Sequence, residues 1–225
     1  PGPFIAMAEL TLRLAAADYP RLLPLAAGHV RAEGIALDLE LGRGGSWPTR
    51  AKMLSRSLND PALEGGEGSM AQHLRRVAAG DRSHVGLPIF VLRGFVHRDL
   101  YVRRDGPVRT PADLKGKRVG MYAWTASGSI WYRQAQAEMG VPVDAVQWVI
   151  GNIEGTTLAP TGDLPPGVKA APRGIAEMLA AGEVDAMWSP PRPQLYDAAK
   201  GPLVRLFPDF AAQERAWWAR HRVWP

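Results

Sequence analysis

The sequence predicts an α/β fold of two lobes, and three features of the chain point to it. Apolar and polar residues alternate over residues 10–14 and again over residues 35–41, with a short leucine-rich helix between them. This order of strand, helix and strand is typical of an α/β layer. The alternation of strands and helices restarts at Leu114 and ends at residues 190–193. Three prolines in these four residues indicate a stiff connector. We therefore expect two lobes rather than one continuous sheet.

The expected lobes are discontinuous in sequence. We predict that residues 1–98 form the first lobe, completed in part by a return segment at residues 203–225, and that residues 99–202 form the second lobe. The chain would cross between the lobes near residues 97–101 and return near residues 190–206. A ligand cleft is expected between the lobes, as in many α/β proteins of this kind.

The other elements of the first lobe surround a glycine-rich segment. A helix capped by Thr49 is expected to run through residue 58, and a second helix over residues 70–79 follows the glycine-rich residues 59–69. We interpret this segment as a tight turn with Ser69 as the helix N-cap, although backbone N–H groups at such a helix start also suit an anion. Glu67 and Ser69 are therefore candidates for the wall of a pocket.

The stretch HVGLPIFVLRGFVHRDLYV, residues 84–102, carries the main functional prediction. It begins as an apolar strand over residues 85–92, and a second apolar run follows at residues 100–102. Between the two runs lie three potential cations, which are Arg93, His97 and Arg98. Ligands of open α/β sheets bind outside the carboxyl ends of the strands, so we expect an anion-binding site here.

The second lobe repeats the alternation of strands and helices. Thr110 and Pro111 are typical of the first residues of a short helical turn. Small and hydroxyl residues at 123–129 lead into a helix whose N-terminus is a second natural anion site. The further elements expected are strands at 114–122, 146–150 and 183–188 and helices at 128–139, 173–181 and 211–221.

Composition excludes several classes of function. The net charge is +5, but the 27 basic residues are scattered among 22 acidic ones and no basic stretch carries interleaved aromatics, so we expect no nucleic-acid partner. The chain has no cysteine, and its five histidines show no metal-binding spacing, so we expect no metal and no cofactor. Whether the chain forms a homo-oligomer stays open.

The location of the protein is predicted from hydrophobicity. No apolar run approaches the roughly 20 residues that span a bilayer, so no membrane partner is expected. Residues 1–19 lack a basic start, and Glu9 and Arg13 interrupt the apolar run before it reaches the length of a signal peptide. We expect a cytoplasmic protein, or a periplasmic one if an export signal has been removed.

Several motifs resemble known families. TPADLKGKRVG at residues 110–120 and EMLAAGEVDAMW at residues 177–188 resemble the type 2 periplasmic binding protein fold of transporter solute-binding proteins. More specifically, the chain resembles the 4,5-dihydroxyphthalate decarboxylase family from about Leu10 to its last residue. The motifs that carry this second resemblance are LPIFVLRGFVHRDLYV, WYR at residues 131–133, VQWVIGNIE and LFPDFAAQERAWW.

This resemblance implies a cytoplasmic enzyme of aromatic degradation, with a type 2 periplasmic-binding-protein-like fold, that removes CO2 from a phthalate-like carboxylate. Family members continue beyond the segment that resembles ERAWWARHRVWP, so the resemblance also implies a fragment, truncated at its C-terminus, with an incomplete first lobe. Two segments depart from the family: residues 59–69 are richer in glycine, and residues 122–125 replace a stretch that usually holds an acidic residue. Both are expected at pocket walls, so the identity of the substrate stays open.

The chemistry of decarboxylation assigns roles to the candidate residues. Loss of CO2 from an electron-rich ring needs a proton for the ring carbon, a grip on the remaining carboxylate and an apolar wall. An arginine grips a carboxylate at two points, and a histidine delivers a proton near neutral pH. We therefore expect Arg93 as the carboxylate clamp, His97 as the general acid and Trp124 as the wall. The full set is His97 and Glu67 as catalytic residues, and Arg93, Ser69, Trp124, Ser127 and Arg133 as substrate-binding residues.

Other interpretations stay open. Arg93 would serve structure alone if it paired with Asp99 or Glu67, and a histidine beside a hinge is more often structural than catalytic. The main competing class is a non-catalytic solute-binding protein of an ABC transporter for a small anionic ligand, which would use the same arginine. A protein of the thiamine-precursor type on this fold is a third class.

Overall fold

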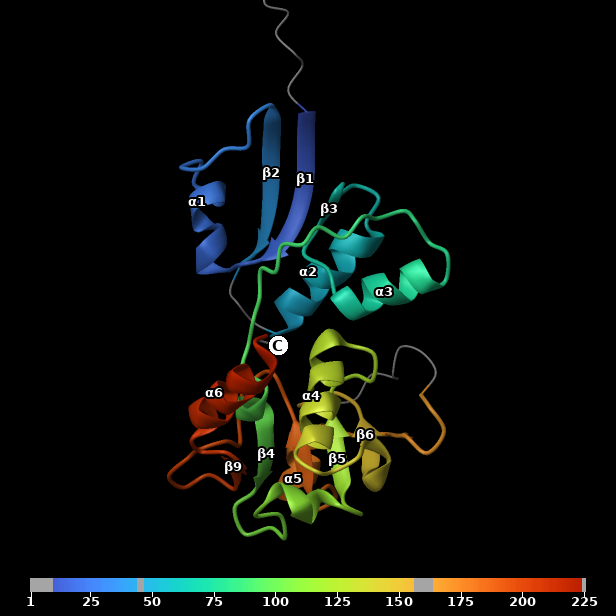
Figure 1. The fold of residues 1–225 in the computed structure, drawn as a ribbon, viewed down its shortest axis with the longest axis vertical. Coiled ribbons are helices and arrows are strands. Elements are labelled where there is room, and N and C mark those ends of the chain that lie inside the picture. Colours follow the sequence, from blue (N-terminus) through green and yellow to red (C-terminus); the bar gives the residue numbers. More distant parts are fainter. Residues whose placement is uncertain (1–9, 44–46, 156–163, 224–225) are drawn as a thin grey trace, which may run out of the picture. The chain divides into compact units, whose positions relative to one another are not determined.

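The computed structural model describes residues 10–43, 47–155 and 164–223 (Figure 1). Its internal contacts divide the chain into two compact units, Pro1–Leu92 and Arg93–Pro225. The division lies just before the expected boundary at residue 98. The expected return segment, residues 203–225, belongs to the second unit, so a part for it in completing the first lobe stays a prediction.

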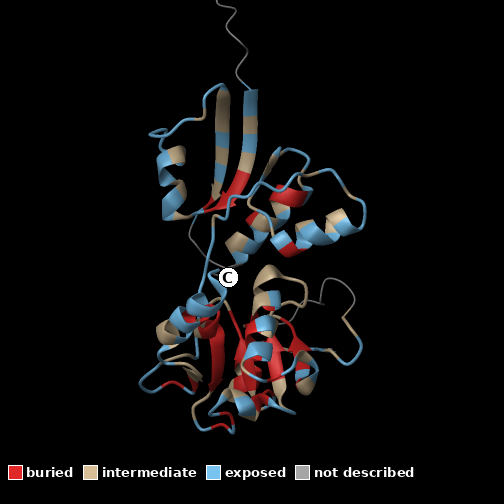
Figure 2. Ribbon diagram, viewed as in Figure 1, coloured by how far each residue is buried: buried red, intermediate tan, exposed pale blue. Residues whose placement is uncertain are grey.

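The first unit is built on a parallel sheet of three strands in the order β2-β1-β3. The two long strands pair along their whole length, from Leu10 opposite Ile35 to Ala17 opposite Gly42, as their alternating sequences predict. The carboxyl end of β1 is buried, whereas its amino end is exposed (Figure 2). The strands are β1 (Leu10–Ala17), β2 (Ile35–Gly42) and β3 (Gly65–Gly66).

Short and long helices connect these strands. A 3-10 turn η1 (Pro20–Leu22) and α1 (Leu23–Ala26) follow β1, α2 (Trp47–Asn59) follows β2, and α3 (Met70–Ala78) follows β3. α2 lies against β1 and β3. The prediction that Thr49 caps this helix is wrong, because Thr49 is the third residue of α2. Ser69 is confirmed as the N-cap of α3, since its side chain accepts a hydrogen bond from the backbone N–H of Gln72.

The glycine-rich segment forms a strand where a turn was expected. Gly65 and Gly66 pair with Leu14 and Ala15 of β1. Gly66 has a φ of +144°, and a Cβ atom there would lie 2.0 Å from the carbonyl oxygen of Ala15. No other residue type fits so close to a neighbouring backbone. The glycine thereby lets β3 pair with β1 and places Glu67 directly after the end of the strand.

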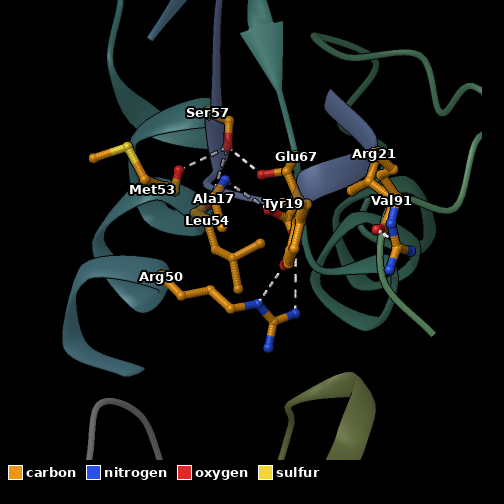
Figure 3. Close-up of polar contacts among 9 residues, drawn as sticks. All are labelled: Ala17, Tyr19, Arg21, Arg50, Met53, Leu54, Ser57, Glu67 and Val91. Carbon is orange, nitrogen blue, oxygen red and sulfur yellow. Dashed lines mark hydrogen bonds and ion pairs between the residues drawn. The ribbon is translucent and has the colours of Figure 1, made fainter. Parts of the chain in front are cut away.

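The prediction of a strand over residues 85–92 is wrong, because this segment is irregular and exposed. Its exposed large apolar residues range from 85% exposed at Val85 to 40% at Leu92, and Val91 is half-buried. Arg21 holds one end of it, since its Nη1 donates to the carbonyl oxygen of Val91 at 2.6 Å (Figure 3). An apolar run becomes a strand only where another strand pairs with it. None of the described strands pairs with this segment.

The second unit contains a mixed sheet of six strands in the order β7-β6-β5-β8-β4-β9. β5 to β8 are mutually parallel along the sheet, whereas β4 runs antiparallel to its neighbours β8 and β9. The strands are β4 (Leu100–Arg103), β5 (Arg118–Met121), β6 (Gln147–Ile150), β7 (Lys169–Ala170), β8 (Ala186–Trp188) and β9 (Leu203–Arg205). β7 and β9 were not expected, because strands of two or three residues carry no recognisable period.

Each face of this sheet has its own apolar core. Leu100 and Val102 pack into one core and Tyr101 into the other, as the two-residue period of a strand requires. Helices cover the sheet, and the capping box at Thr110 confirms the expected start of η3. The helices are η2 (His97–Asp99), η3 (Pro111–Leu114), α4 (Ser127–Glu138), η4 (Val143–Ala145), α5 (Ile175–Ala180) and α6 (Phe210–His221).

Candidate functional site

A cluster of three polar side chains lies at the carboxyl edge of the first sheet. Because all three strands are parallel, their carboxyl ends meet at one edge, which is where α/β sheets bind ligands. Tyr19 follows β1, Glu67 follows β3, and Arg50 belongs to α2, which follows β2. Figure 3 shows the three side chains pointing toward one another.

Glu67 is the centre of this cluster. Its Oε1 accepts a hydrogen bond from the hydroxyl of Tyr19 at 2.7 Å and lies 3.5 Å from Nη2 of Arg50. Its Oε2 accepts a hydrogen bond from the backbone N–H of Ala17 at 3.0 Å. The Glu67 side chain is 5% exposed, so its carboxylate is almost completely removed from water, and its contacts fix its position.

Tyr19 gives the cluster a defined direction of hydrogen bonding. Burial raises the pKa of Tyr19 to about 12, and its hydrogen bond to Glu67 acts in the same direction. The phenol is therefore neutral at physiological pH. It donates its proton to Glu67 and accepts a hydrogen bond of 2.7 Å from Nε of Arg50.

Ser69 and Ser57 of this unit form hydrogen bonds with backbone groups. Oγ of Ser69 accepts from the N–H of Gln72 at 3.5 Å, which is the N-cap contact of α3. Ser57 is a buried residue that the sequence analysis did not single out. Its Oγ donates to the carbonyl of Met53 at 2.8 Å and also contacts the carbonyl oxygen of Glu67 (Figure 3). Ser57 thereby ties α2 to the residue after β3.

The second unit brings other candidates to the carboxyl edge of its own sheet. β5 and β8 end at this edge, and the antiparallel β4 begins there, so η2 and the N-terminus of α4 lie at the same edge. Two predicted residues, Glu67 and Ser69, belong to the first unit. The others belong to the second unit, and they are Arg93, His97, Trp124, Ser127 and Arg133.

His97 is buried and paired with Glu214 of α6. Oε1 of Glu214 accepts the backbone N–H of His97 at 2.7 Å and lies 3.0 Å from its Nδ1. The imidazole also has edge-to-face contacts with Phe207 and Trp217, at centroid distances of 5.7 and 6.0 Å. Glu214 has no exposed surface. This pair anchors α6 on η2 and orients the imidazole through Nδ1, which leaves Nε2 as the nitrogen for any proton transfer.

Asp99, two residues further along η2, is a buried carboxyl group that the sequence analysis left out of the site. It accepts hydrogen bonds from the hydroxyl of Tyr132 and from Nε of Arg98, both at 2.8 Å. Burial raises the pKa of Asp99 to about 6, and the contact with Arg98 offsets this rise only in part. Asp99 therefore changes its charge close to physiological pH.

The side chains of Trp124 and Arg133 pack against each other. The guanidinium carbon of Arg133 lies 4.1 Å from the centroid of a Trp124 ring, and its Nη1 donates to the Trp124 carbonyl oxygen at 2.7 Å. The indole also packs edge-to-face on Trp148 at 5.9 Å. Burial lowers the pKa of Arg133, which nevertheless stays charged at physiological pH. The predicted wall thus carries a cation, with Ser127 opening the adjacent helix α4.

Arg93 is exposed at the start of the second unit. Among the described residues, no group of three histidine or acidic side chains is placed to hold a metal ion. No helix in the described ranges is long and apolar enough to cross a membrane.

Comparison with known proteins finds relatives that match most of the chain. Residues 71–162 match the family model described as NMT1/THI5 like. A 4,5-dihydroxyphthalate decarboxylase from Comamonas testosteroni is 30% identical over 226 residues, which is 97% of this chain and 67% of the relative. A protein of the same name from Pseudomonas putida is 27% identical over 223 residues, 95% of this chain and 83% of the relative.

Solved structures show the fold. The periplasmic aliphatic sulphonate binding protein SsuA from Escherichia coli has a TM-score of 0.52 at 17% identity, over 93% of this chain and 69% of its own. The alkanesulfonate-binding protein SsuA from Xanthomonas axonopodis pv. citri has a TM-score of 0.46 at 21% identity, and this chain spans 56% of it. The first likeness confirms the predicted type 2 periplasmic-binding-protein-like fold.

Proposed function

This chain belongs to the 4,5-dihydroxyphthalate decarboxylase family, and from that premise we propose that it removes CO2 from a hydroxylated aromatic carboxylate of the phthalate type. The observation that carries the proposal is the coverage of the two relatives, which share their name and match 97% and 95% of this chain. The matched region includes the carboxyl edges of both sheets. The reaction is proposed to take place in the cytoplasm, without a metal or a nucleic-acid partner.

The proposed reaction exchanges one substituent of the ring for a proton. The bond between a ring carbon and a carboxylate carbon breaks, CO2 leaves, and the electron pair stays on the ring carbon, which then takes up a proton. The second carboxylate stays on the product. The protein must therefore hold one carboxylate, place the other against a surface that does not stabilise its charge, and deliver one proton.

The site residues are proposed for these three tasks. Arg93, together with Arg133, holds the retained carboxylate, and the indole of Trp124, on which Arg133 packs, forms the apolar wall for the other carboxylate. His97 delivers the proton through Nε2 while Glu214 fixes Nδ1, and Glu67, once it has itself taken up a proton, is the alternative proton donor. Ser69 and Ser127 are proposed to donate hydrogen bonds to the ring substituents.

Two substitutions separate binding from chemistry. Arg93→Ala should weaken binding of an aromatic carboxylate by about 2 to 4 kcal/mol, because it removes a charge-assisted contact with two hydrogen bonds. His97→Gln should leave binding nearly unchanged and lower turnover by about 10² to 10⁴, the usual scale for a lost general acid. Equilibrium binding of phthalate and the rate of CO2 release from 4,5-dihydroxyphthalate measure the two effects. Arg31→Ala and His29→Gln, at exposed positions of the first unit, are the matched controls.

The contrast between the two variants decides the assignment. Loss of binding in both variants, without a selective change in turnover, would mean that the pair holds a ligand or the fold. Unchanged turnover in His97→Gln would mean that Glu67 or another group donates the proton.

The second candidate function is that of a non-catalytic solute-binding protein for a small anion. This function would imply a periplasmic location. The fold shared with the sulphonate-binding protein favours it, as does the match to the NMT1/THI5 like model. Saturable binding of 4,5-dihydroxyphthalate without any release of CO2 would select this candidate.

A further inference from the structure

We propose that Arg98 of η2 is an anion-binding residue of the second unit, and that its Nη1 and Nη2 grip a carboxylate of the ligand at two points. The choice of an aromatic dicarboxylate as the ligand rests on the proposed function. The proposal that Arg98 binds an anion rests on the geometry of the second unit alone.

The guanidinium of Arg98 is fixed through one of its nitrogens. Its Nε donates to Oδ1 of Asp99 at 2.8 Å, and the backbone carbonyl of Arg98 accepts a hydrogen bond of 3.0 Å from Nε of Arg205. Within the described ranges, neither Nη1 nor Nη2 of Arg98 has a hydrogen-bond or ion-pair partner. These two nitrogens form an edge of the guanidinium that matches the two oxygens of a carboxylate.

Asp99 has no second oxygen to offer to this edge. Its Oδ2 accepts a hydrogen bond of 2.8 Å from the hydroxyl of the buried Tyr132. The ring of Tyr132 is itself held in place, because it stacks on the buried Trp188 at a centroid distance of 4.9 Å. Asp99 therefore orients Arg98 through one oxygen and leaves the Nη1 and Nη2 edge to another anion.

Arg118, at the start of β5, shows how an arginine of the same sheet pairs with an aspartate when its role is structural. Its Nε and Nη2 donate to the two oxygens of Asp185, both at 3.1 Å, and Nη2 also donates to the carbonyl oxygen of Gly182 at 2.9 Å. An arginine that served only to hold Asp99 would be expected to make the same two-point contact. Arg98 makes one contact instead.

The cation of this pair reaches the surface and the acid does not. The side chain of Arg98 is 37% exposed, compared with 5% for Asp99. Both residues precede Leu100, which lies opposite Trp188 at the carboxyl end of β8. Arg98 is therefore accessible from solution at the edge of the sheet where α/β proteins bind ligands, whereas Arg118 lies at the opposite edge.

The charges around Arg98 favour an anion. Burial raises the pKa of Asp99 to about 6, so close to this pH part of the molecules carry a neutral Asp99 beside a charged Arg98. Arg205 is a further cation that acts on Asp99. Tyr101 and Tyr132 also act on Arg98, but the pKa of each phenol is raised and both are neutral at physiological pH. Of these groups two are cations and one is an acid, which leaves a positive charge for a bound carboxylate to neutralise.

The test compares the two arginines that pair with an aspartate in the second unit. Arg98→Gln and Arg118→Gln each remove one positive charge and one ion pair, at opposite edges of the sheet. Binding of phthalate to each variant is measured by calorimetry. Phthalate affinity should fall about 10- to 100-fold in Arg98→Gln, the usual effect of losing hydrogen bonds to a charged group. It should stay within about twofold of the wild type in Arg118→Gln.

A second variant keeps the test decisive if Arg98→Gln fails to fold. Arg98→Lys retains a positive charge to pair with Asp99 but lacks the planar edge that grips a carboxylate at two points. It should melt close to the wild-type temperature and bind phthalate about 3- to 10-fold more weakly. Wild-type phthalate affinity in a folded Arg98→Lys would contradict the two-point grip.

The outcomes distinguish this inference from the proposed function. Wild-type phthalate affinity in Arg98→Gln, an equal loss of affinity in Arg98→Gln and Arg118→Gln, or no saturable binding of phthalate by the wild type would each overturn the inference. Phthalate binding that depends on Arg98, in a protein that releases no CO2, would support the inference and contradict the decarboxylase proposal. Release of CO2 from 4,5-dihydroxyphthalate with unchanged kcat and KM in Arg98→Gln would support the decarboxylase proposal and overturn the inference.

Discussion

Asp99 shows how burial of a single carboxyl group makes stability depend on pH. Its pKa rises from 3.8 to about 6 because it is buried, with Arg98 and Tyr132 as its hydrogen-bond partners and Arg205 as a further nearby cation. Between these two pKa values the folded state binds more protons than the unfolded state. The free energy of unfolding should therefore fall as the pH rises through this window.

This dependence is measurable against a variant. Two pKa units correspond to about 3 kcal/mol, so the wild type should lose up to that amount of stability relative to Asp99→Asn between pH 4 and pH 7. Urea unfolding at several pH values gives the difference. Asp60→Asn is the control: the pKa of Asp60 is lowered from 3.8, so its effect has the opposite sign and falls below about pH 4, and the difference between wild type and this variant should hardly change between pH 4 and pH 7. A difference between wild type and Asp99→Asn that stays constant with pH would contradict the assignment.

Single residues of the site differ in how far the sequence could predict them. Glu67 and Ser69 were candidates because a glycine-rich segment before a helix is a recognisable signal, and their part in a site stays a prediction. Tyr19 and Arg50 were missed because their contacts with Glu67 depend on which strands pair. A local sequence pattern does not predict that pairing. Glu214 was missed because it lies 117 residues from His97. One signal in the sequence could have pointed to Glu214. It lies three positions before the apolar Trp217, on the same face of a helix.

At the scale of elements, β3 depends on one glycine. Gly66→Ala should destabilise the first unit by roughly 2 to 4 kcal/mol, because the added methyl group meets the backbone of Ala15 at a positive φ. Hydrogen exchange of the β1 backbone amides should speed up in this variant. Gly94→Ala is the matched control, since a Cβ there has no neighbour within 4 Å. Equal exchange rates in the two variants would show that β3 does not need glycine at this position.

The elements that the sequence predicted share a strong period or a cap. β1, β2 and α4 have such patterns, and the structure places them close to their expected bounds. The segment 85–92 has apolar composition without alternation, and such composition does not distinguish a paired strand from an exposed segment. Pairing partners decide between the two, and they come from the tertiary structure.

At the scale of the whole molecule, the α/β class was predictable because strand patterns and helix patterns follow each other in the sequence. The internal contacts divide the chain between Leu92 and Arg93, and the expected lobe boundary at residue 98 stays a prediction. The contact of α6 with η2 was not predicted, because it joins segments that are distant in sequence. The first unit was expected to receive α6, whereas the described contacts of Trp217 and Glu214 are with the second unit.

The central claim is that this chain catalyses the loss of CO2 from a phthalate-like substrate, and the most direct measurement is the stoichiometry of that reaction. The purified wild-type protein is incubated with 4,5-dihydroxyphthalate carrying 13C in its carboxyl groups, and NMR follows substrate, product and CO2 together. We predict one CO2 released for each substrate consumed, with a dihydroxybenzoate as the product that retains one labelled carboxylate. Saturable binding with the substrate left intact would contradict the claim and identify the chain as a binding protein for the same anion.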